Sequence, residues 1–286
     1  MQYFKKRFSV IRLRLFALPM LVLILSTALI LPVFGSVTAD PYPDFYAEKL
    51  VKTGSGDFSE KKCVYLSFDD GPSACTDKIL DILSEKGVNA TFFVIGPEGE
   101  LTDERLLRII KEGNEIGLHS YCHKYNEIYA GVDSFLSDLS TEQDWIYSVT
   151  GERCGIFRFP GGSANRHADK STVSEIKDEM SRRGFVWYDW NADSEDSIHK
   201  YISAWEITQN VFRCAKDKDC VVVLLHDASG HDATVEALPG IIDGFLERGY
   251  SFQLLSDMEV PLQYKEQNPL RADCAKGISV VCNTKN

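Results

Sequence analysis

Two adjacent carboxylates, Asp69 and Asp70, stand at the end of the apolar run 64–68 and directly before Gly71 and Pro72. Successive side chains leave a strand on opposite faces, so the two acids cannot point the same way and we expect them to have different roles. Glycine and proline favour a tight loop at this point. The same four residues are also ordinary turn chemistry, so the pair gains meaning only together with polar clusters elsewhere in the chain.

The second cluster contains two histidines, His119 and His123, spaced four residues apart. On a helical turn this spacing places both imidazoles on one face, where they could bind one metal ion. A carboxylate of the Asp pair would complete a three-ligand site with an open position for water, which is the catalytic form of zinc binding. We therefore predict a divalent metal ion, with zinc as the first choice. The other histidines lie in polar surroundings and are expected to be solvated: His167, His199 and His231.

Short apolar runs alternate with amphipathic segments through most of the chain. This alternation predicts an α/β fold, a distorted parallel (β/α) barrel with about seven strands, because no glycine-rich phosphate loop indicates a dinucleotide fold. The active site of such a barrel lies at the carboxyl ends of the strands, where the polar clusters fall. The expected strands are 64–68, 90–95, 115–119, 156–159, 185–188, 221–225 and 252–255.

The chain divides into four expected parts. Residues 1–39 carry five basic residues and no acid, with an apolar run over 15–34, which is typical of a signal peptide cleaved after Ala39 or of an uncleaved membrane anchor. Either alternative predicts an extracytoplasmic protein, secreted or anchored in the membrane. A polar linker over 40–61, a catalytic domain over 62–266 and a tail over 267–286 follow.

The charge of the chain restricts its partners. The formal net charge is −11, and removing the five basic residues of the leader leaves −16 for the rest. Phosphate binding needs Lys and Arg, so we expect no nucleic acid partner, and a neutral sugar polymer fits better.

Eight cysteines in an exported chain suggest disulfides, although buried free thiols are an equal alternative. Cys63 and Cys220 each stand six residues before a candidate catalytic residue, so they would lie level if their strands were parallel neighbours. Other candidate pairs are Cys214 with Cys220, Cys274 with Cys282, and Cys75 with Cys122. If Cys122 is not in a disulfide, we expect it to be a thiol in a loop.

Taken in chain order, the clusters resemble the motifs of the polysaccharide deacetylases, carbohydrate esterase family 4. The resemblance covers roughly residues 62–256, and five ordered motifs are far more specific than any single one. The matching segments are Ser67 to Pro72, His119-Ser120-x-x-His123, Arg158-x-Pro160-x-Gly162, residues 190–196 and Leu224-x-His226.

The resemblance implies a role for each matching residue. Asp69 would be the general base, and Arg158 would orient it. Asp70, with the two histidines of the second cluster, would bind the metal. The backbone N–H of Gly161 would help to hold the oxyanion, as in other acyl-transfer sites.

The last motifs supply the acid and the acetyl pocket. His226 would protonate the departing amine, with Asp196 holding its imidazole, and Leu224 would line the pocket for the acetyl methyl. The family often places Trp after the acid aligned with Asp196, whereas this chain has Ser197. The choice between Asp193 and Asp196 therefore stays open, and Trp187 or Trp190 could supply the missing wall.

The resemblance implies a metal-dependent hydrolase that removes acetyl groups from N-acetylglucosamine units of a cell-wall polysaccharide. Peptidoglycan is the first choice, because a membrane-proximal domain on a short linker faces the wall. Deacetylation of chitin oligosaccharides or of acetylated xylan is the alternative. A catalytically silent glycan-binding protein is a further alternative, which the presence of every motif residue disfavours.

Overall fold

The computed structural model describes residues 42–47, 62–199 and 201–264, so the predicted leader and tail lie outside the described residues. The strands are β1 (Cys63–Gly71), β2 (Thr91–Ile95), β3 (Glu115–Ser120), β4 (Ile156–Phe157), β5 (Val186–Trp187), β6 (Ala192–Asp193), β7 (Cys220–His226) and β8 (Ser251–Phe252). The helices are α2 (Ala74–Lys86), α3 (Thr102–Lys111), α4 (Tyr125–Ile128), α5 (Val132–Thr150), α6 (Lys170–Arg182), α7 (Ala204–Ala215) and α8 (Asp232–Glu247), with a 3-10 turn at Leu255–Asp257.

The strands form one parallel sheet in the order β5-β4-β3-β2-β1-β7-β6, with β8 paired to the start of β1. The predicted α/β class and distorted parallel barrel are confirmed. The end strands β5 and β6 follow each other in the chain, and no pairing joins them within the described residues, so the barrel is open there. Seven strands lie in this order, in agreement with the predicted number of about seven, and β8 is an eighth in the described part. The strand β6 was not among the expected ones, because it has only two residues and gives no alternating pattern.

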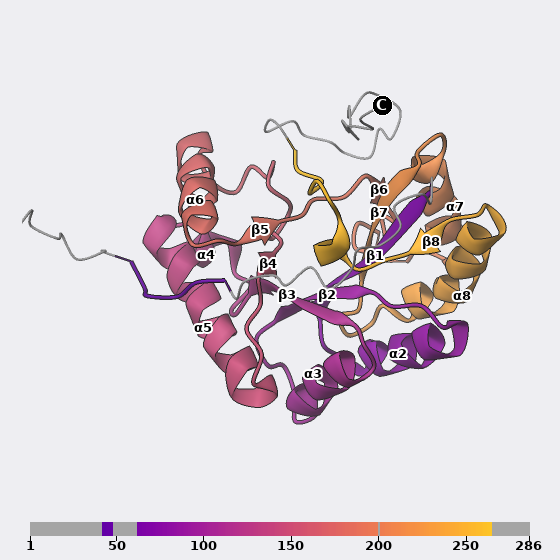
Figure 1. Ribbon diagram of the computed structural model, residues 1–286, viewed down its shortest axis with the longest axis horizontal. Coiled ribbons are helices and arrows are strands. Elements are labelled where there is room, and N and C mark those ends of the chain that lie inside the picture. The colour runs from indigo at the N-terminus through magenta and orange to yellow at the C-terminus, as the bar shows by residue number, and fades with distance from the viewer. Residues whose placement is uncertain (1–41, 48–61, 200, 265–286) are drawn as a thin grey trace, which may run out of the picture. The chain divides into compact units, whose positions relative to one another are not determined.

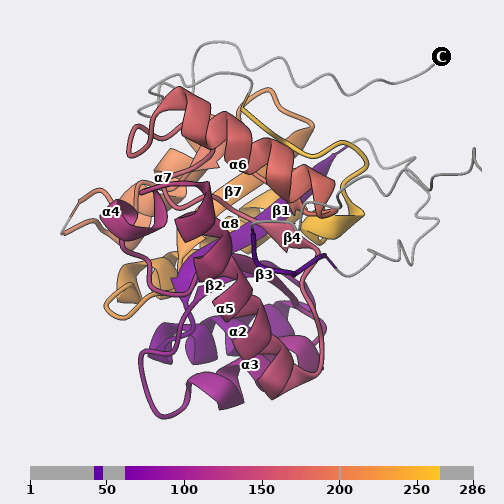
Figure 2. The same cartoon turned by 90° about the vertical axis from the view of Figure 1, so that its left-hand side faces the viewer.

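Helices cover the outer side of the sheet, as Figure 1 shows for α2, α3, α7 and α8. Figure 2 shows α5 and α6 in front of β3 and β4. Alternate side chains of β1 divide between two cores: Leu66 and Phe68 pack outward against the helices, whereas Tyr65 packs inward. The inner core also contains Phe93 and residues that follow β8, among them Leu255.

The inner core needs a glycine in β3. A Cβ atom at Gly117 would lie 2.5 Å from the Phe93 ring, so only glycine leaves room for that ring inside the barrel. Phe93 in turn supports a buried arginine, Arg158, whose guanidinium carbon lies 4.2 Å from the ring centroid. The inner core therefore forms the floor beneath the carboxyl ends of the strands.

Part of the predicted linker packs on the domain. Phe45 is 3% exposed and lies 5.4 Å, centroid to centroid, from Phe185. The buried Arg183 donates hydrogen bonds to the carbonyl oxygens of Pro43 (2.5 Å) and Phe45 (2.8 Å). Residues 42–47 are thus held at the end of α6 rather than extending away from it.

Within the described residues, no helix has both the length and the apolar character that membrane crossing requires. Cys63 and Cys220 lie opposite each other in the register of β1 and β7, as predicted. Cys75 and Cys122 are free thiols, so they do not pair with each other. Cys214 is disulfide-bonded, although not to Cys220, and the suggested Cys274–Cys282 pair lies outside the described residues.

Candidate functional site

Polar side chains from several strands meet on the inner face of the sheet, at the carboxyl ends of the strands. In β1, Asp69 follows Tyr65 at an interval of four residues and therefore points to the same inner side. In β7, His226 follows the inner residue Val222 at the same interval. The register of β1 and β7 places Asp69 directly opposite His226, so the two side chains face one space.

Asp70, His119 and His123 converge beside this pair. Asp70 Oδ1 lies 3.3 Å from His119 Nε2 and 3.2 Å from His123 Nε2. The three residues offer one ligand atom each, all within 4.8 Å of one another. Burial raises the pKa of Asp70, but the neighbouring imidazoles lower it well below its ordinary value, so the carboxylate is ionised.

The two histidines do not lie on a helical turn, and that expectation is wrong. His119 belongs to β3, and His123 follows in a turn at φ +50°. Ser120 and Asp138 hold this turn: Ser120 Oγ accepts from His123 N at 2.8 Å, and Asp138 accepts from the N–H groups of Tyr121 (2.8 Å) and Cys122 (2.9 Å). These local bonds bring the two imidazoles together where a four-residue spacing in a strand could not.

The three groups fit a divalent metal ion. His119 Nδ1 lies 2.9 Å from the carbonyl oxygen of Arg158, which can only accept, so in the neutral imidazole Nδ1 carries the proton and Nε2 presents a lone pair. Asp70 Oδ1 and His123 Nε2 are buried and have no hydrogen-bond partner. Three electron-pair donors without a bridging hydrogen bond repel one another unless a cation lies between them. One carboxylate and two imidazoles are also a protein ligand set that leaves a coordination position open.

Arg158 holds Asp69 in place. Its side chain is completely buried, and Nη1 donates to Asp69 Oδ1 at 2.8 Å and to Ser67 Oγ at 2.8 Å. Nε donates to the carbonyl oxygen of Tyr188 at 2.9 Å. The guanidinium is therefore fixed at both ends, and the second oxygen of Asp69 remains on the side of His119, at 3.9 Å.

His226 is paired with Asp196. Its Nδ1 donates to Asp196 Oδ1 at 2.6 Å, while Asp196 Oδ2 accepts from His226 N and from Thr234 Oγ1, each at 2.8 Å. Burial favours the neutral imidazole, but the Asp196 carboxylate outweighs it and raises the pKa of His226 to about 10. Asp193 instead accepts from Trp190 Nε1 and Glu195 N, so Asp196 is the partner of His226.

The remaining predicted residues surround this cluster. Gly161 is exposed at φ +76°, and a Cβ atom there would lie 3.2 Å from the ring of Tyr125. Leu224 is 5% exposed and shares the inner face of β7 with His226. Trp190 lies against Gly162 and has the guanidinium of Arg158 at 5.7 Å from its ring. Trp187 packs with Phe157 and Phe159 in the outer core and does not border the site.

Sequence reasoning missed Asp227, which is fully buried beside the cluster. Thr76 Oγ1 donates to its carboxylate at 2.5 Å, Ser73 Oγ donates to its carbonyl oxygen at 2.6 Å, and its own N–H donates to Asp69 O at 3.1 Å. Burial raises the pKa of Asp227 to about 7, and the carboxylates of Asp69 and Asp70 add to the effect. The available signal was an acid at the end of an apolar strand, which we used for Asp69 and Asp70 but not here.

The aromatic residue Tyr125 was also missed. Its ring lies 5.4 Å from that of His123 and 4.1 Å from that of His167, centroid to centroid. His167 is exposed, as predicted, although it stacks on this tyrosine. Burial raises the pKa of Tyr125 to about 12, so its hydroxyl stays protonated at neutral pH.

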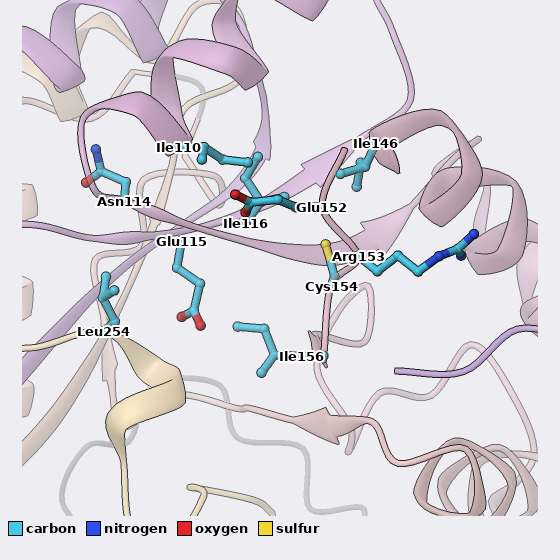
Figure 3. Close-up of a pocket in the computed structure, with 11 residues that line it drawn as sticks. Ile110, Asn114, Glu115, Ile116, Ile146, Glu152, Arg153, Cys154, Ile156 and Leu254 are labelled. Carbon is cyan, nitrogen blue, oxygen red and sulfur yellow. The ribbon is translucent and has the colours of Figure 1, made fainter. Parts of the chain in front are cut away.

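A cavity of about 230 Å³ lies elsewhere, at the amino ends of β3 and β4 (Figure 3). Its lining includes Glu115, Cys154 and Leu254. The Glu115 carboxylate accepts from Thr91 Oγ1 at 2.8 Å and from Ser256 N at 3.3 Å, so this acid already serves the fold. The cavity is therefore separate from the cluster at the carboxyl ends.

Comparisons with known proteins agree with the arrangement. A family model described as polysaccharide deacetylase matches residues 57–175. The putative polysaccharide deacetylase YheN of Bacillus subtilis is 35% identical over 225 residues, which are 77% of this chain and 75% of that protein. A peptidoglycan-N-acetylglucosamine deacetylase of Bacillus cereus is 31% identical over 198 residues, 68% of this chain and 69% of that one. The crystal structure of the catalytic domain of a peptidoglycan N-acetylglucosamine deacetylase from Eubacterium rectale superposes with a TM-score of 0.68 at 33% identity, covering 72% of this chain and 94% of that domain.

Proposed function

Since this chain belongs to the polysaccharide deacetylase family, whose enzymes remove acetyl groups from polysaccharides, we propose its substrate. We propose that it hydrolyses the acetamide of N-acetylglucosamine units in peptidoglycan. The reaction adds water across the amide: a carbon–oxygen bond forms, the carbon–nitrogen bond breaks, and acetate and a free amine leave. An amide is a poor electrophile and an amine is a poor leaving group. The site must therefore activate water, stabilise the oxyanion and protonate the nitrogen.

The observation that carries the proposal is the register of β1 and β7, which sets Asp69 opposite His226. Asp69 accepts a proton from the attacking water, and its hydrogen bond to Arg158 fixes which oxygen is available. Positioned acids and bases of this kind each contribute about 10² to 10⁴ in rate. The backbone N–H of Gly161 donates to the developing oxyanion.

Asp70, His119 and His123 would hold a divalent ion, for which zinc is our choice. Such an ion would supply Lewis acidity by polarising the carbonyl and lowering the pKa of water. The second oxygen of Asp69 lies beside this ligand set, 3.9 Å from His119, so base and metal would act on the same water.

His226 delivers the proton to the leaving nitrogen. Asp196 keeps Nδ1 protonated and raises the pKa of the imidazole, so a proton is available at Nε2 at neutral pH. Leu224, two residues earlier on the same face, offers the apolar contact for the acetyl methyl. The acid and the base thus approach the substrate from neighbouring strands.

Peptidoglycan is our choice of polymer for two reasons. The relatives from Bacillus cereus and Eubacterium rectale are both described as peptidoglycan N-acetylglucosamine deacetylases. The basic and apolar leader is typical of export, and we propose that the enzyme acts outside the cytoplasm, secreted or anchored. There it meets the acetylated glycan of the wall.

The test is the release of acetate by the purified protein from N-acetylglucosamine oligomers, from peptidoglycan and from acetylated xylan, with zinc and after chelation. We expect peptidoglycan to give the highest kcat/KM, with activity lost on chelation and restored by zinc. Faster release of acetate from acetylated xylan would show that xylan, rather than peptidoglycan, is the substrate. Activity that survives complete removal of metal would overturn the metal-dependent mechanism.

A further inference from the structure

A second group of metal-ligating side chains lies beside the proposed catalytic acid. Asp196, His226 and His231 each offer one ligand atom, and these atoms lie within 4.8 Å of one another. His231 is half-buried at the start of α8, and the proposed reaction gives it no role.

The two imidazoles of this group are arranged like those of the first group. The rings of His226 and His231 are 5.6 Å apart with an interplanar angle of 26°. The rings of His119 and His123 are 5.2 Å apart with an angle of 29°. The carboxylates of the two groups differ in position: Asp70 faces the Nε2 atoms of the first pair, whereas Asp196 is hydrogen-bonded to Nδ1 of His226.

Both imidazoles of the second group have their Nδ1 atoms engaged. His226 Nδ1 donates to Asp196 at 2.6 Å, and His231 Nδ1 lies 3.2 Å from the carbonyl oxygen of Ala228, which can only accept. Each Nε2 is therefore free to present a lone pair when the imidazole is neutral. A metal-ligating histidine commonly donates its other N–H to a carboxylate or a backbone carbonyl in this way.

We propose that the Nε2 atoms of His226 and His231 form a second, weaker site for a divalent transition-metal ion, with Asp196 orienting His226 from Nδ1, and that an ion bound there inhibits the enzyme. The site binds more weakly than the first because it offers two imidazoles and no carboxylate ligand: Asp196 is hydrogen-bonded to His226 Nδ1, on the other side of that ring from Nε2. In the first group, Asp70 Oδ1 faces both imidazoles and accepts no hydrogen bond. Inhibition follows because an ion on His226 occupies the nitrogen that delivers the proton. This second part rests on the proposed deacetylation.

The direct test counts zinc ions on the full chain in detergent. The protein is stripped with a chelator and dialysed, and zinc chloride is titrated in by calorimetry, with the bound zinc measured after equilibrium dialysis. We expect a tight ion and a weaker one, and we expect His231→Gln to lose the weaker ion while it keeps the tight one. Glutamine keeps an uncharged polar side chain at this position but presents no imidazole nitrogen.

His199→Gln is the matched control, because His199 is an exposed histidine in the loop after Asp196 and lies outside both groups. It should bind both ions like the wild type. Asp70→Asn should lose the tight ion and keep the weaker one. A single ion on the wild type, or a weaker ion that persists in His231→Gln, would overturn the second site.

Acetate release over a range of zinc concentrations tests the inhibition. The wild type should lose at least half of its activity as zinc fills the weaker site, and His231→Gln should need at least tenfold more zinc for the same loss. A weaker ion that binds without slowing the wild type would refute inhibition. If the ions bind as expected but no glycan releases acetate at any zinc concentration, the deacetylation fails while the second site stands.

Discussion

Asp69 and Asp70 are neighbours in the chain but lie in different surroundings. Asp69 is 4% exposed and hydrogen-bonded to Arg158, whereas Asp70 adopts φ +70° and turns toward two imidazoles. A positive φ is uncommon for a residue other than glycine and points to a functional constraint. The local backbone therefore separates the proposed base from the proposed metal ligand, as the opposite faces of a strand would require.

We expect Asp69→Asn and Asp70→Asn to fail in different ways. Asp69→Asn should retain bound metal and lose about 10² to 10⁴ in kcat, because the amide cannot accept the proton from water. Asp70→Asn should lose both the metal and the activity. Metal content after gel filtration, measured beside acetate release, separates the two. An active Asp70→Asn protein without metal would contradict the ligand assignment.

A second prediction concerns the pH dependence of the acid. Asp196 raises the pKa of His226 to about 10, so loss of the Asp196 charge should lower that pKa. As the proposed general acid, His226 must be protonated to act. In Asp196→Asn, the alkaline fall of kcat should therefore move to lower pH, while the amide oxygen still accepts from Nδ1. Profiles of kcat against pH measure the shift.

Asp193→Asn is the matched control for this profile. Asp193 belongs to the same stretch but bonds to Trp190 and Glu195 instead of His226. Because the Asp193 charge acts on His226 without a hydrogen bond, the alkaline limb of Asp193→Asn should move less than that of Asp196→Asn. A shift of equal size in both variants would mean that the effect is general electrostatics rather than the His226–Asp196 pair.

At the scale of elements, the junction of β1 and α2 positions the two acids. Ser73 caps α2 and Thr76 completes a capping box, while both hydroxyls also donate to Asp227 at the end of β7. The junction is thus fixed to the neighbouring strand by side-chain bonds as well as by the β1–β7 ladder. Gly71 lies against the same carboxylate.

Gly71→Ala should disturb this junction. A Cβ atom there would lie 2.1 Å from Asp227 Oδ2, and overpacking of this kind typically costs about 1 to 3 kcal/mol. In an Asp227→Gly background the same substitution should cost at least 1 kcal/mol less, since the clashing carboxylate is gone. Urea unfolding of the four proteins gives the coupling. If the effects of the two substitutions on the free energy of unfolding are additive, the contact between residue 71 and Asp227 does not restrict the junction.

The elements explain why some of the site could be predicted and some could not. Period-two alternation in β1 and β7 places Asp69 and His226 on one face, and that pattern is visible in the sequence. The turn that holds His123 depends on Asp138, fifteen residues later in α5, which no local pattern reveals. The position of Asp227 at the end of an apolar strand is visible in the sequence, but its bonds come from the start of another helix and are not.

At the scale of the whole molecule, the described domain begins before its first strand. The apolar runs predict strands from 64 onward, but residues 42–47 have no periodic pattern and resemble a linker in composition. Only tertiary contact shows that Phe45 belongs to the outer core. The buried guanidinium of Arg183, 5.1 Å from the Phe45 ring centroid, holds the segment through its carbonyl oxygens.

Phe45→Ala should therefore destabilise the catalytic domain. Truncation of a buried phenylalanine costs about 3 to 5 kcal/mol in a core, and a value of about 2 to 3 kcal/mol suits a segment that reaches the core from one side. At about 2 to 4 °C per kcal/mol for a domain of this size, Tm should fall by roughly 4 to 12 °C.

Asp44→Ala, at an exposed neighbour, should change the free energy of unfolding by less than about 0.5 kcal/mol. Because Phe45 packs in the outer core, on the other side of the sheet from the inner-face cluster, kcat at 25 °C should match that of the wild type. Equal Tm values for Phe45→Ala and Asp44→Ala would mean that these residues act as a linker after all.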